Sequence, residues 1–359
     1  MQIQPTPLIV RLGVLLLISI CFVLAPVSQA QDTGTESPAS KGEFLGAMES
    51  VYPDWFKVSF LELEDDVAEA AEAGKRLMLL FHQDGCPYCN AFVERNLAQK
   101  DIEDTLKEKF DVIEINMWGD REVASVGGNV YTEKTFAEAL RVQFTPTILF
   151  LNEQGSLALR INGYYDPDRF RLVLDYVSNK REKEKTFDEF MREQTPEETQ
   201  KEIVSHPYIT GPVTELATRP GSGDKPLLLL FEQGNCRNCE TLHKDIFSLE
   251  ESQALLEEFD VYQIDMWGRD AFTLPDGTTT TGRDWSRTLG ISYAPTLITF
   301  AADGTEVIRS EAWFKRFHTQ SILHYVLSDE WREQPNFQRY LSDRAEHIRE
   351  QGIDVNIFD

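Results

Sequence analysis

Positive charge and cysteine are both scarce in this chain of 359 residues. It has 5 cysteines, and its 35 lysines and arginines are outnumbered by 60 aspartates and glutamates, for a formal net charge of -25. Because nucleic acid and anionic lipid also carry negative charge, neither is expected as a partner. The sequence Asn-x-Ser/Thr does not occur, so an acceptor for N-glycosylation is missing. An exported bacterial protein therefore fits the sequence better than one of the endoplasmic reticulum.

Long apolar runs are also rare, and the one near the N-terminus predicts a secretory signal peptide over residues 1–30. A single basic residue, Arg11, precedes an uncharged run over 12–25, and Ser28-Gln29-Ala30 has the small-x-small pattern of a cleavage site. An uncleaved anchor helix is the alternative, but the run is shorter than the ~20 residues that a membrane span needs. We expect cleavage after Ala30, a periplasmic location and no stable membrane insertion of the mature chain.

Four cysteines remain after the signal peptide, with its Cys21, is removed, and they form two Cys-x-x-Cys pairs. The same landmarks surround both pairs, which indicates a tandem repeat. The landmarks are an apolar run before the pair (77–81 and 227–231), the string Asp-Val-x-x-Ile-x-Met-Trp-Gly after it (from Asp111 and Asp260), and an x-Pro-Thr entry to a later strand (145–147 and 294–296).

The repeat predicts the domain boundaries. Residues 31–42, rich in Ser, Thr, Gly and Pro, read as a flexible lead-in. Similarity between the repeats continues through the charged segment 180–194, which is therefore predicted to be the closing helix of the first repeat. We expect a first domain over 43–194, a second over 195–351 and a tail over 352–359.

The cysteine spacing indicates redox chemistry. A thiolate attacks disulfides and a thiol does not, and a cysteine at the N-terminal end of a helix has backbone N–H groups and the helix dipole to stabilise its charge. Each pair follows an apolar strand directly and starts a predicted helix, and Pro87 is tolerated in a first turn. The second cysteine, one turn later, can resolve a mixed disulfide.

Cysteine pairs can also serve three other purposes: a structural disulfide, a zinc site or inert buried thiols. A structural disulfide closing so small a loop contributes only ~2 kcal/mol, against ~5 kcal/mol for a bridge across 150 residues. A zinc site would need the two pairs close in sequence and a reducing compartment. Inert buried thiols would not explain two matching pairs. We therefore expect two redox-active disulfides, with no metal and no other cofactor.

The order of a strand, Cys-x-x-Cys at a helix start, and a strand entered through x-Pro resembles the thioredoxin fold. The Met-Trp-Gly string and the long segment after it resemble the SoxW-type thioredoxin-related proteins. The resemblance implies an α/β chain of two consecutive thioredoxin-like domains, each a central mixed β-sheet flanked by helices with an extra C-terminal helix. It also implies roles for particular residues: Cys86 and Cys236 as nucleophiles, Cys89 and Cys239 as resolving cysteines, Pro146 and Pro295 as cis prolines, and Thr145 and Ala294 as backbone partners of a substrate peptide.

The chain also departs from thioredoxins. Leu80 and Leu230 occupy the position where thioredoxins carry a buried aspartate, which leaves three nearby candidates for proton transfer, any of which could instead be a surface residue: His82, Asp84 and Glu232. The segments 120–144 and 269–293 are predicted to hold extended loops. Trp118 and Trp267, which precede them, are expected either to line a substrate groove or to pack in the core.

These features predict a thiol-disulfide oxidoreductase that reduces protein disulfides with electrons from a membrane thiol reductase. The alternative is a peptide-binding or holdase-type module whose cysteines are secondary. Arg237 follows Cys236 directly, whereas Pro87 and Tyr88 follow Cys86 without charge. Because a positive charge favours the thiolate, the sequence predicts the lower thiol pKa at Cys236.

Overall fold

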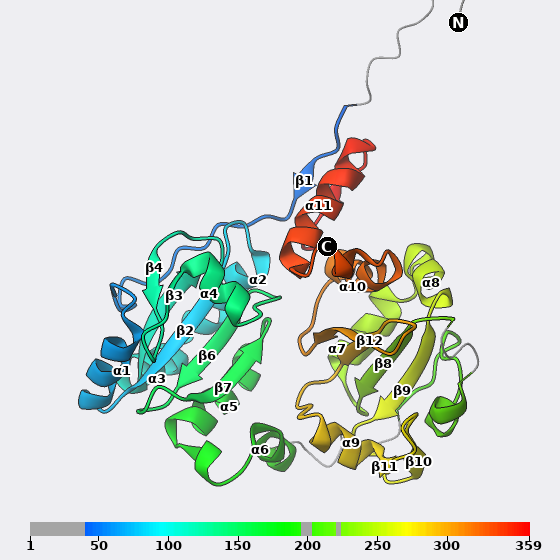
Figure 1. The fold of residues 1–359 in the computed structure, drawn as a ribbon, viewed down its shortest axis with the longest axis horizontal. Helices are drawn as coiled ribbons and strands as arrows, with labels where there is room; N and C mark the ends of the chain where they lie inside the picture. Colours follow the sequence, from blue (N-terminus) through cyan, green and yellow to red (C-terminus); the bar gives the residue numbers. More distant parts are fainter. Residues whose placement is uncertain (1–39, 195–202, 220–223) are drawn as a thin grey trace, which may run out of the picture. The chain divides into compact units, whose positions relative to one another are not determined.

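The computed structural model describes residues 40–194, 203–219 and 224–359. The predicted signal peptide and most of the lead-in lie outside the described residues. The helices within the described ranges are all too short or too polar to cross a membrane. Two four-stranded sheets dominate this part of the chain, one in each half of the sequence (Figure 1).

The first sheet has the strand order β3-β2-β6-β7. At its centre, β2 (Arg76–His82) pairs in parallel with β3 (Phe110–Asn116) and antiparallel with β6 (Thr147–Leu151), which pairs antiparallel with β7 (Leu157–Asn162). Every residue of β2 is buried. A strand covered on both faces is expected to be apolar throughout rather than alternating, which explains the run before the first cysteine pair.

Successive side chains of β2 point to opposite faces, and helices cover both. Met78 and Leu80 belong to the core under α2 (Pro87–Ala91), η1 (Phe92–Leu97), α3 (Lys100–Lys109) and α5 (Pro167–Ser178). Leu77, Leu79 and Phe81 pack instead with residues of α1 (Leu63–Glu72) and α4 (Glu133–Ala139). The first half is thus a three-layer α/β domain.

The second sheet repeats the arrangement, with the order β13-β12-β8-β9. Its central strand β8 (Leu227–Glu232) pairs in parallel with β9 (Asp260–Asp265) and antiparallel with β12 (Thr296–Phe300), which pairs antiparallel with β13 (Glu306–Ser310). The predicted fold class, two α/β domains with mixed sheets flanked by helices, is confirmed.

The helical layers of the second domain differ from the first at one position. One face carries η5 (Leu242–Ile246), α8 (Glu250–Glu257) and α10 (Arg316–Leu327), and α7 (Arg237–Thr241) leads directly into η5. The other face carries α9 (Gly282–Thr288) and a short 3-10 segment, η4 (Val213–Thr218), whose Leu216 is in the core. The second domain thus has this short turn where the first has the full helix α1.

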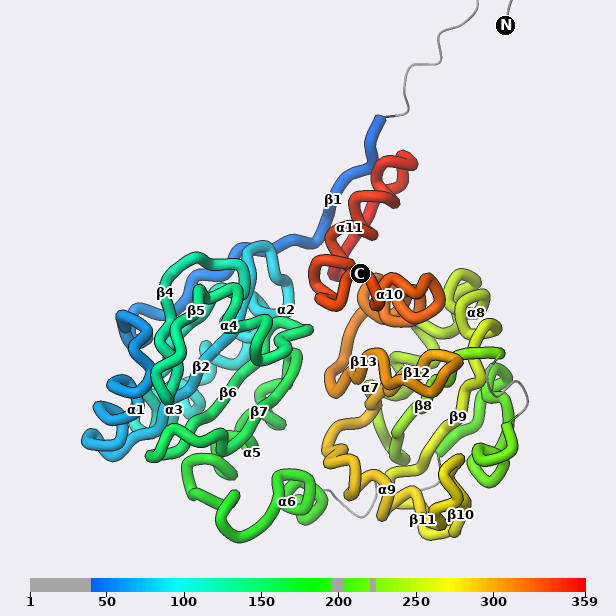
Figure 2. Tube along the Cα trace, in the orientation of Figure 1, coloured from blue at the N-terminus to red at the C-terminus, as the bar shows by residue number. Residues whose placement is uncertain are grey.

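The expectation of extended loops at 120–144 and 269–293 was wrong. Each segment forms a small hairpin before its helix: β4 (Glu122–Ala124) with β5 (Val130–Thr132), and β10 (Ala271–Thr273) with β11 (Thr279–Thr281) (Figure 2). Strands this short give too few alternations to be recognised in a sequence. Val123 and Phe272 are buried and anchor the two hairpins to their domains.

Each repeat ends in the closing helix that the sequence predicted. These are α6 (Phe187–Gln194) and α11 (Phe337–Glu350), preceded by the short turns η2 (Arg181–Lys183) and η6 (Glu330–Arg332). The two ends of the described chain are also joined, because β1 (Phe44–Leu45) pairs in parallel with β14 (Val355–Asn356). The C-terminal tail is therefore tied to the first residues of the predicted first domain.

Candidate redox sites

The first cysteine pair is a disulfide at the start of a helix. Cys86 is the N-cap of α2, and its sulfur atom accepts a hydrogen bond of 3.0 Å from the backbone N–H of Cys89. Pro87 occupies the first helical position, where a missing N–H costs nothing. Cys86 and Cys89 are only 3% and 1% exposed. The sulfur atom of Cys86 thus lies at the helix N-terminus, as the sequence predicted.

The second pair has the same local geometry. Cys236 is bonded to Cys239, caps α7, and its sulfur atom accepts a hydrogen bond of 3.1 Å from the backbone N–H of Cys239. The residue before each first cysteine has a left-handed backbone, with φ of +70° at Gly85 and +53° at Asn235. Glycine and asparagine are the residues that adopt this conformation most readily, so the same turn leads into both helices.

The x-Pro loops lie directly against the first cysteines. The Thr145-Pro146 and Ala294-Pro295 peptide bonds are both cis. The carbonyl oxygen of Thr145 is 3.6 Å from the sulfur of Cys86, and the carbonyl oxygen of Ala294 is 3.6 Å from the sulfur of Cys236. The Thr145 hydroxyl adds a contact of 3.4 Å to Cys86. Alanine has no hydroxyl, so the second site lacks this contact.

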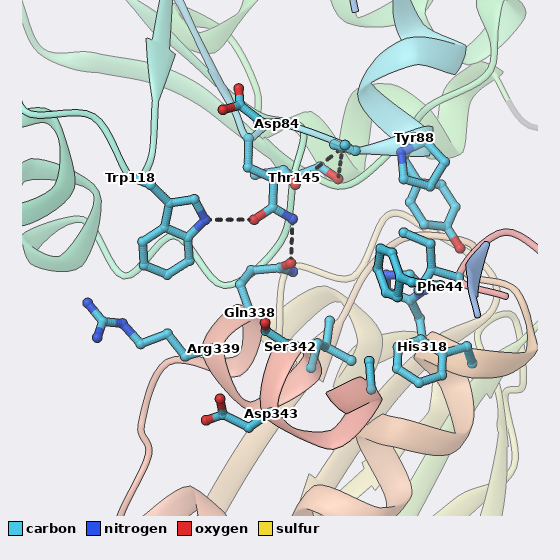
Figure 3. Close-up of a pocket in the computed structure, with 18 of the residues that line it drawn as sticks. Phe44, Asp84, Tyr88, Trp118, Thr145, His318, Gln338, Arg339, Ser342 and Asp343 are labelled. Carbon is cyan, nitrogen blue, oxygen red and sulfur yellow. Dashed lines mark hydrogen bonds between the residues drawn. The ribbon is translucent and has the colours of Figure 1, made fainter. Parts of the chain in front are cut away.

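A pocket of about 550 Å³ opens beside the first disulfide (Figure 3). Its lining includes Cys86, Thr145 and Trp118 from the first domain and Gln338 of α11 from the second. The Trp118 indole donates a hydrogen bond of 2.9 Å to the side-chain oxygen of Gln83, and Gln83 donates one of 2.7 Å to Gln338. The structure therefore places Trp118 at the edge of the first site.

Trp267 occupies the matching position in the second domain but does not border its disulfide pocket. Its indole donates a hydrogen bond of 3.1 Å to Gln233, and the Arg192 guanidinium lies over its ring at 5.7 Å. It is half-buried against the core of the second domain. Of the two tryptophans that the sequence offered as groove residues, the structure brings only Trp118 to a disulfide pocket.

The second disulfide opens into a smaller pocket of about 190 Å³ with acid–base groups in its wall. Its lining includes Cys236, Cys239, Glu232, His206 and His243. The Glu232 carboxylate is 2.8 Å from the His243 ring and accepts a hydrogen bond from the Gln263 amide. Glu232 is 1% exposed and His243 is also buried. A carboxylate and an imidazole are thus held together beside the redox disulfide.

Two histidines of this pocket were not singled out from the sequence. His206 stacks on His243 with 3.7 Å between ring centroids, and the Tyr208 hydroxyl forms a hydrogen bond with His243 Nδ1. Burial lowers the pKa of His206, His243 lowers it further, and the Glu232 carboxylate opposes both. His243 lies one helical turn after Cys239, a spacing that could have revealed it. His206 lies far from the cysteines in sequence, and no local pattern marks it.

The first domain also pairs a histidine with a carboxylate, but the two groups come from different positions in the sheet. His82, at the position that Glu232 holds in the second domain, contacts the Glu114 carboxylate at 2.6 Å. Burial alone would raise the pKa of Glu114, but the hydrogen bond to His82 and the charge of Arg121 outweigh it, and the pKa is lowered. Asp84 is exposed. Of the three candidates for proton transfer, His82 and Glu232 are therefore buried rather than surface residues.

Tyr88, between the first two cysteines, is held by aromatic rings of the second domain. Its ring centroid lies 5.4 Å from Phe314, 5.1 Å from His318 and 5.4 Å from Phe358, all edge-to-face. Its hydroxyl accepts a hydrogen bond of 3.0 Å from the Lys315 backbone N–H. We call Phe314, His318 and Phe358 the aromatic cage. No local sequence pattern predicts this cage, because its rings come from residues far from Tyr88 in the chain.

Comparison with known proteins assigns the family. The Thioredoxin-like domain model matches residues 63–178 and 214–325, together more than half of the chain. The chain therefore belongs to the thioredoxin-like family and contains two of its domains. With a disulfide-bonded Cys-x-x-Cys in each, it is a thiol-disulfide oxidoreductase by class.

Solved structures resemble single domains of the chain. A thioredoxin-fold protein from Helicobacter pylori is 25% identical, with 34% of this chain and 80% of that one covered and a TM-score of 0.30. A thioredoxin from Thermus thermophilus is 19% identical, with 38% and 87% covered and a TM-score of 0.27. The C-terminal domain of DsbD from Neisseria meningitidis is 15% identical, with 33% and 91% covered and a TM-score of 0.25. The search of curated proteins finds no match.

Within the described ranges, no group of three or more His, Cys, Asp or Glu side chains is arranged to hold a metal ion. A sulfur at a helix N-terminus, a second cysteine one turn later and an adjacent backbone carbonyl are a geometry that suits exchange with an incoming disulfide.

Proposed function

We propose that this protein is an exported oxidoreductase that reduces the disulfides of periplasmic proteins, using both cysteine pairs. The observation that carries the proposal is that the sulfur of Cys86 and of Cys236 sits at a helix N-terminus against a cis-proline loop. The three-part pattern of residues 1–30 supports export. The Asp-Val-x-x-Ile-x-Met-Trp-Gly strings support a relationship to SoxW-type proteins, and a membrane thiol reductase is the proposed electron donor.

The proposed reaction balances as dithiol-disulfide exchange. The thiolate of Cys86 or Cys236 attacks one sulfur of the substrate, a mixed disulfide forms, and the other substrate sulfur leaves as a thiolate and takes up a proton. Cys89 or Cys239 then attacks the mixed disulfide and releases the second substrate thiol. The substrate is reduced, the protein pair is oxidised, and the donor dithiol restores it.

Trapping of the mixed disulfide tests this proposal. Cys89→Ser and Cys239→Ser variants keep the attacking thiolate but cannot resolve the intermediate. We expect both to accumulate disulfide-linked partner proteins in cells, seen as bands on non-reducing gels that vanish with dithiothreitol. Cys86→Ser and Cys236→Ser should trap nothing at their own sites. Trapping that survives the loss of Cys86 or Cys236 would reverse the assigned roles.

A variant without cysteines in the mature chain separates the oxidoreductase from a peptide-binding module. If the chain acted only as a holdase, replacing all four cysteines with serine would leave its suppression of aggregation of an unfolded protein unchanged and trapping would be absent throughout.

Export is tested separately by mass spectrometry of the mature protein from a periplasmic fraction. We expect Gln31 at its N-terminus, and a retained residue 1 in the membrane fraction would contradict the signal peptide.

A further inference from the structure

The pocket at the first disulfide has two walls that come from opposite ends of the sequence. One wall is the cysteine loop from Gln83 to Tyr88, and the other is α11 (Figure 3). Gln338 links them, since it accepts the hydrogen bond from Gln83 at 2.7 Å and donates one of 2.9 Å to the carbonyl oxygen of Gln143. The Phe337 backbone N–H also donates to the Gln143 side chain at 2.8 Å. Helix α11 is therefore fastened beside the disulfide.

This second wall restricts how a substrate reaches Cys86. A stable protein partner usually contributes about 800 Å² of its own surface to an interface. At the first site, residues of α11 line the pocket beside Cys86, and Tyr88 is already enclosed by the aromatic cage, which narrows the surface around the disulfide that a protein partner could contact. A small ligand that fits inside the pocket therefore reaches the sulfur of Cys86 more readily than a folded protein does, because the protein would have to insert a loop into the same pocket.

The size and lining of the pocket indicate the kind of ligand. Its volume of about 550 Å³ lies within the range of roughly 300–1,000 Å³ that small-molecule sites occupy. Its lining combines apolar side chains, such as Phe317, with charges of both signs: Asp84 on the cysteine loop, and on α11 Asp343 and Arg339, whose guanidinium also contacts the Glu138 carboxylate at 3.5 Å. Neighbouring positive and negative groups suit a ligand that carries both a carboxylate and an ammonium group.

We propose that the first site takes low-molecular-weight disulfides of amino-acid or short-peptide thiols, and that α11 is the wall that selects them. This inference rests on the proposed exchange activity. The Cys86 thiolate would attack one sulfur of the small disulfide, releasing the first thiol with a proton. Cys89 would then displace the second thiol, leaving the protein disulfide for the donor dithiol to reduce. One substrate disulfide gives two thiols, and the electrons come from the Cys86–Cys89 dithiol.

The test uses the full mature chain with Cys236→Ser and Cys239→Ser, so that only the first pair reacts. The pre-reduced protein is mixed with cystine, with cystine whose amino and carboxyl groups are blocked, or with insulin, and the loss of protein thiols is followed over time. We expect the rate constant with cystine to exceed those with insulin and with blocked cystine by about tenfold, as one charge-assisted contact would give. Insulin or blocked cystine reacting as fast as cystine overturns the inference.

Two variants locate the selecting wall. Ser342→Trp fills the pocket from α11, whereas His347→Trp adds the same side chain to the same helix at an exposed position outside the pocket. We expect Ser342→Trp to slow cystine at least tenfold and His347→Trp to change it less than twofold, by the same conversion of contact energy to rate. Equal effects of the two variants overturn the assignment of α11.

The outcomes separate this inference from the proposed function. Both variants are first checked for folding by circular dichroism, and the comparison of cystine with blocked cystine needs no change in the pocket. If the protein with only the first pair fails to exchange with every disulfide, including the reactive aromatic disulfide dithiobis(nitrobenzoate), the proposed function fails at this site. If it reduces insulin and cystine equally well, the exchange activity stands and the selective pocket is overturned.

Discussion

The two redox sites share their backbone geometry and differ in what surrounds the sulfur atoms. Each first cysteine caps a helix, accepts an N–H bond from its partner cysteine and lies 3.6 Å from a carbonyl oxygen of a cis-proline loop. The first site has the Thr145 hydroxyl and a second wall from α11, whereas the second site has a buried carboxylate–histidine pair. The fold thus supplies the same attacking group twice, and neighbouring side chains make the two sites chemically different.

The acid–base groups show this difference most clearly. Register places Leu80 opposite Glu114 in the first sheet and Leu230 opposite Gln263 in the second. The acid is thus on the neighbouring strand in the first domain, with His82 at the end of the central strand. In the second domain the acid is Glu232 on the central strand, and its partner His243 lies in η5, directly after α7. Only the second arrangement faces a disulfide pocket.

The largest expected effect comes from removing one attacking sulfur at a time. Cys86→Ser should abolish exchange at the first site, and Cys236→Ser at the second, because a serine hydroxyl is a far weaker nucleophile than a thiolate at neutral pH. We expect a loss on the order of a thousandfold at the altered site, measured as a rate constant in a chain whose other pair is replaced by two serines. A rate constant at the altered site within tenfold of the unaltered one would contradict the assignment of the attacking sulfur at that site.

The next effect concerns the residue between the cysteines, which is caged in one domain only. Tyr88→Ala should lower the free energy of unfolding by about 3–5 kcal/mol, because it empties a fully packed aromatic position. Asn238→Ala is the matched control, since Asn238 is half-buried and makes one hydrogen bond of 3.0 Å to Tyr293. That change should cost about 1 kcal/mol. Urea unfolding measures both, and equal losses would mean that the aromatic cage contributes little.

The aromatic cage should also make stability depend on pH. Burial lowers the pKa of His318 to about 4, although a hydrogen bond to the Ile357 backbone opposes the shift. Between this value and the ordinary histidine pKa of about 6.5, the unfolded chain binds more protons than the folded one, so stability falls as the pH is lowered. The loss from pH 7 to pH 4 attributable to His318 is about 3 kcal/mol.

A His318→Phe variant provides the control for this pH dependence. Phenylalanine keeps an aromatic ring in the cage and cannot be protonated, so its stability should change less between pH 7 and pH 4 than that of the unaltered chain. Thermal unfolding at several pH values measures the difference. Parallel curves for the two proteins would show that His318 does not control the response.

A smaller effect is expected at the carboxylate of the second site. Glu232→Gln keeps the side-chain shape but cannot exchange a proton with the cysteines. General acid–base groups contribute to rates through such transfers, and we expect about a tenfold slower resolution step at the second site. His82→Gln in the first domain is the comparison and should have little effect, since His82 does not line the first pocket. Stopped-flow kinetics measure the resolution rate at each site. Equal slowing by Glu232→Gln and His82→Gln would contradict a special role for Glu232.

The sequence predicted the fold and the cysteine geometry because both depend on local patterns. The apolar runs of β2 and β8, the cysteine spacing and the x-Pro positions each recur at a fixed offset. The aromatic cage, the α11 wall and the pairing of β1 with β14 could not be predicted, because they join residues far apart in the chain. Extended loops were wrongly expected within the segments 120–144 and 269–293, since three-residue strands leave no readable period. His206 could not be predicted either, because its contact with His243 joins residues far apart in the chain.

The smallest expected effect is the difference in acidity between the two attacking thiols, and here the contacts oppose the prediction from sequence. That prediction gave Cys236 the lower pKa because Arg237 follows it, but Arg237 is exposed and its charge is screened by solvent. The Thr145 hydroxyl, 3.4 Å from Cys86, can donate to a thiolate there, while the buried Glu232 disfavours a second negative charge near Cys236. We therefore expect the lower thiol pKa at Cys86. A thiolate that is more stable makes its site more oxidising, so electrons would pass from the second pair to the first.

Exchanging the two residues before the cis prolines tests this expectation. Thr145→Ala should raise the pKa of the Cys86 thiol, and Ala294→Thr should lower that of Cys236. Thiolate absorbance, titrated in full-length chains that keep one cysteine pair each, measures both shifts. A lower value at Cys236 in the unaltered chain would show that Arg237 outweighs both the Thr145 hydroxyl and Glu232, and it would reverse the direction of electron transfer between the sites.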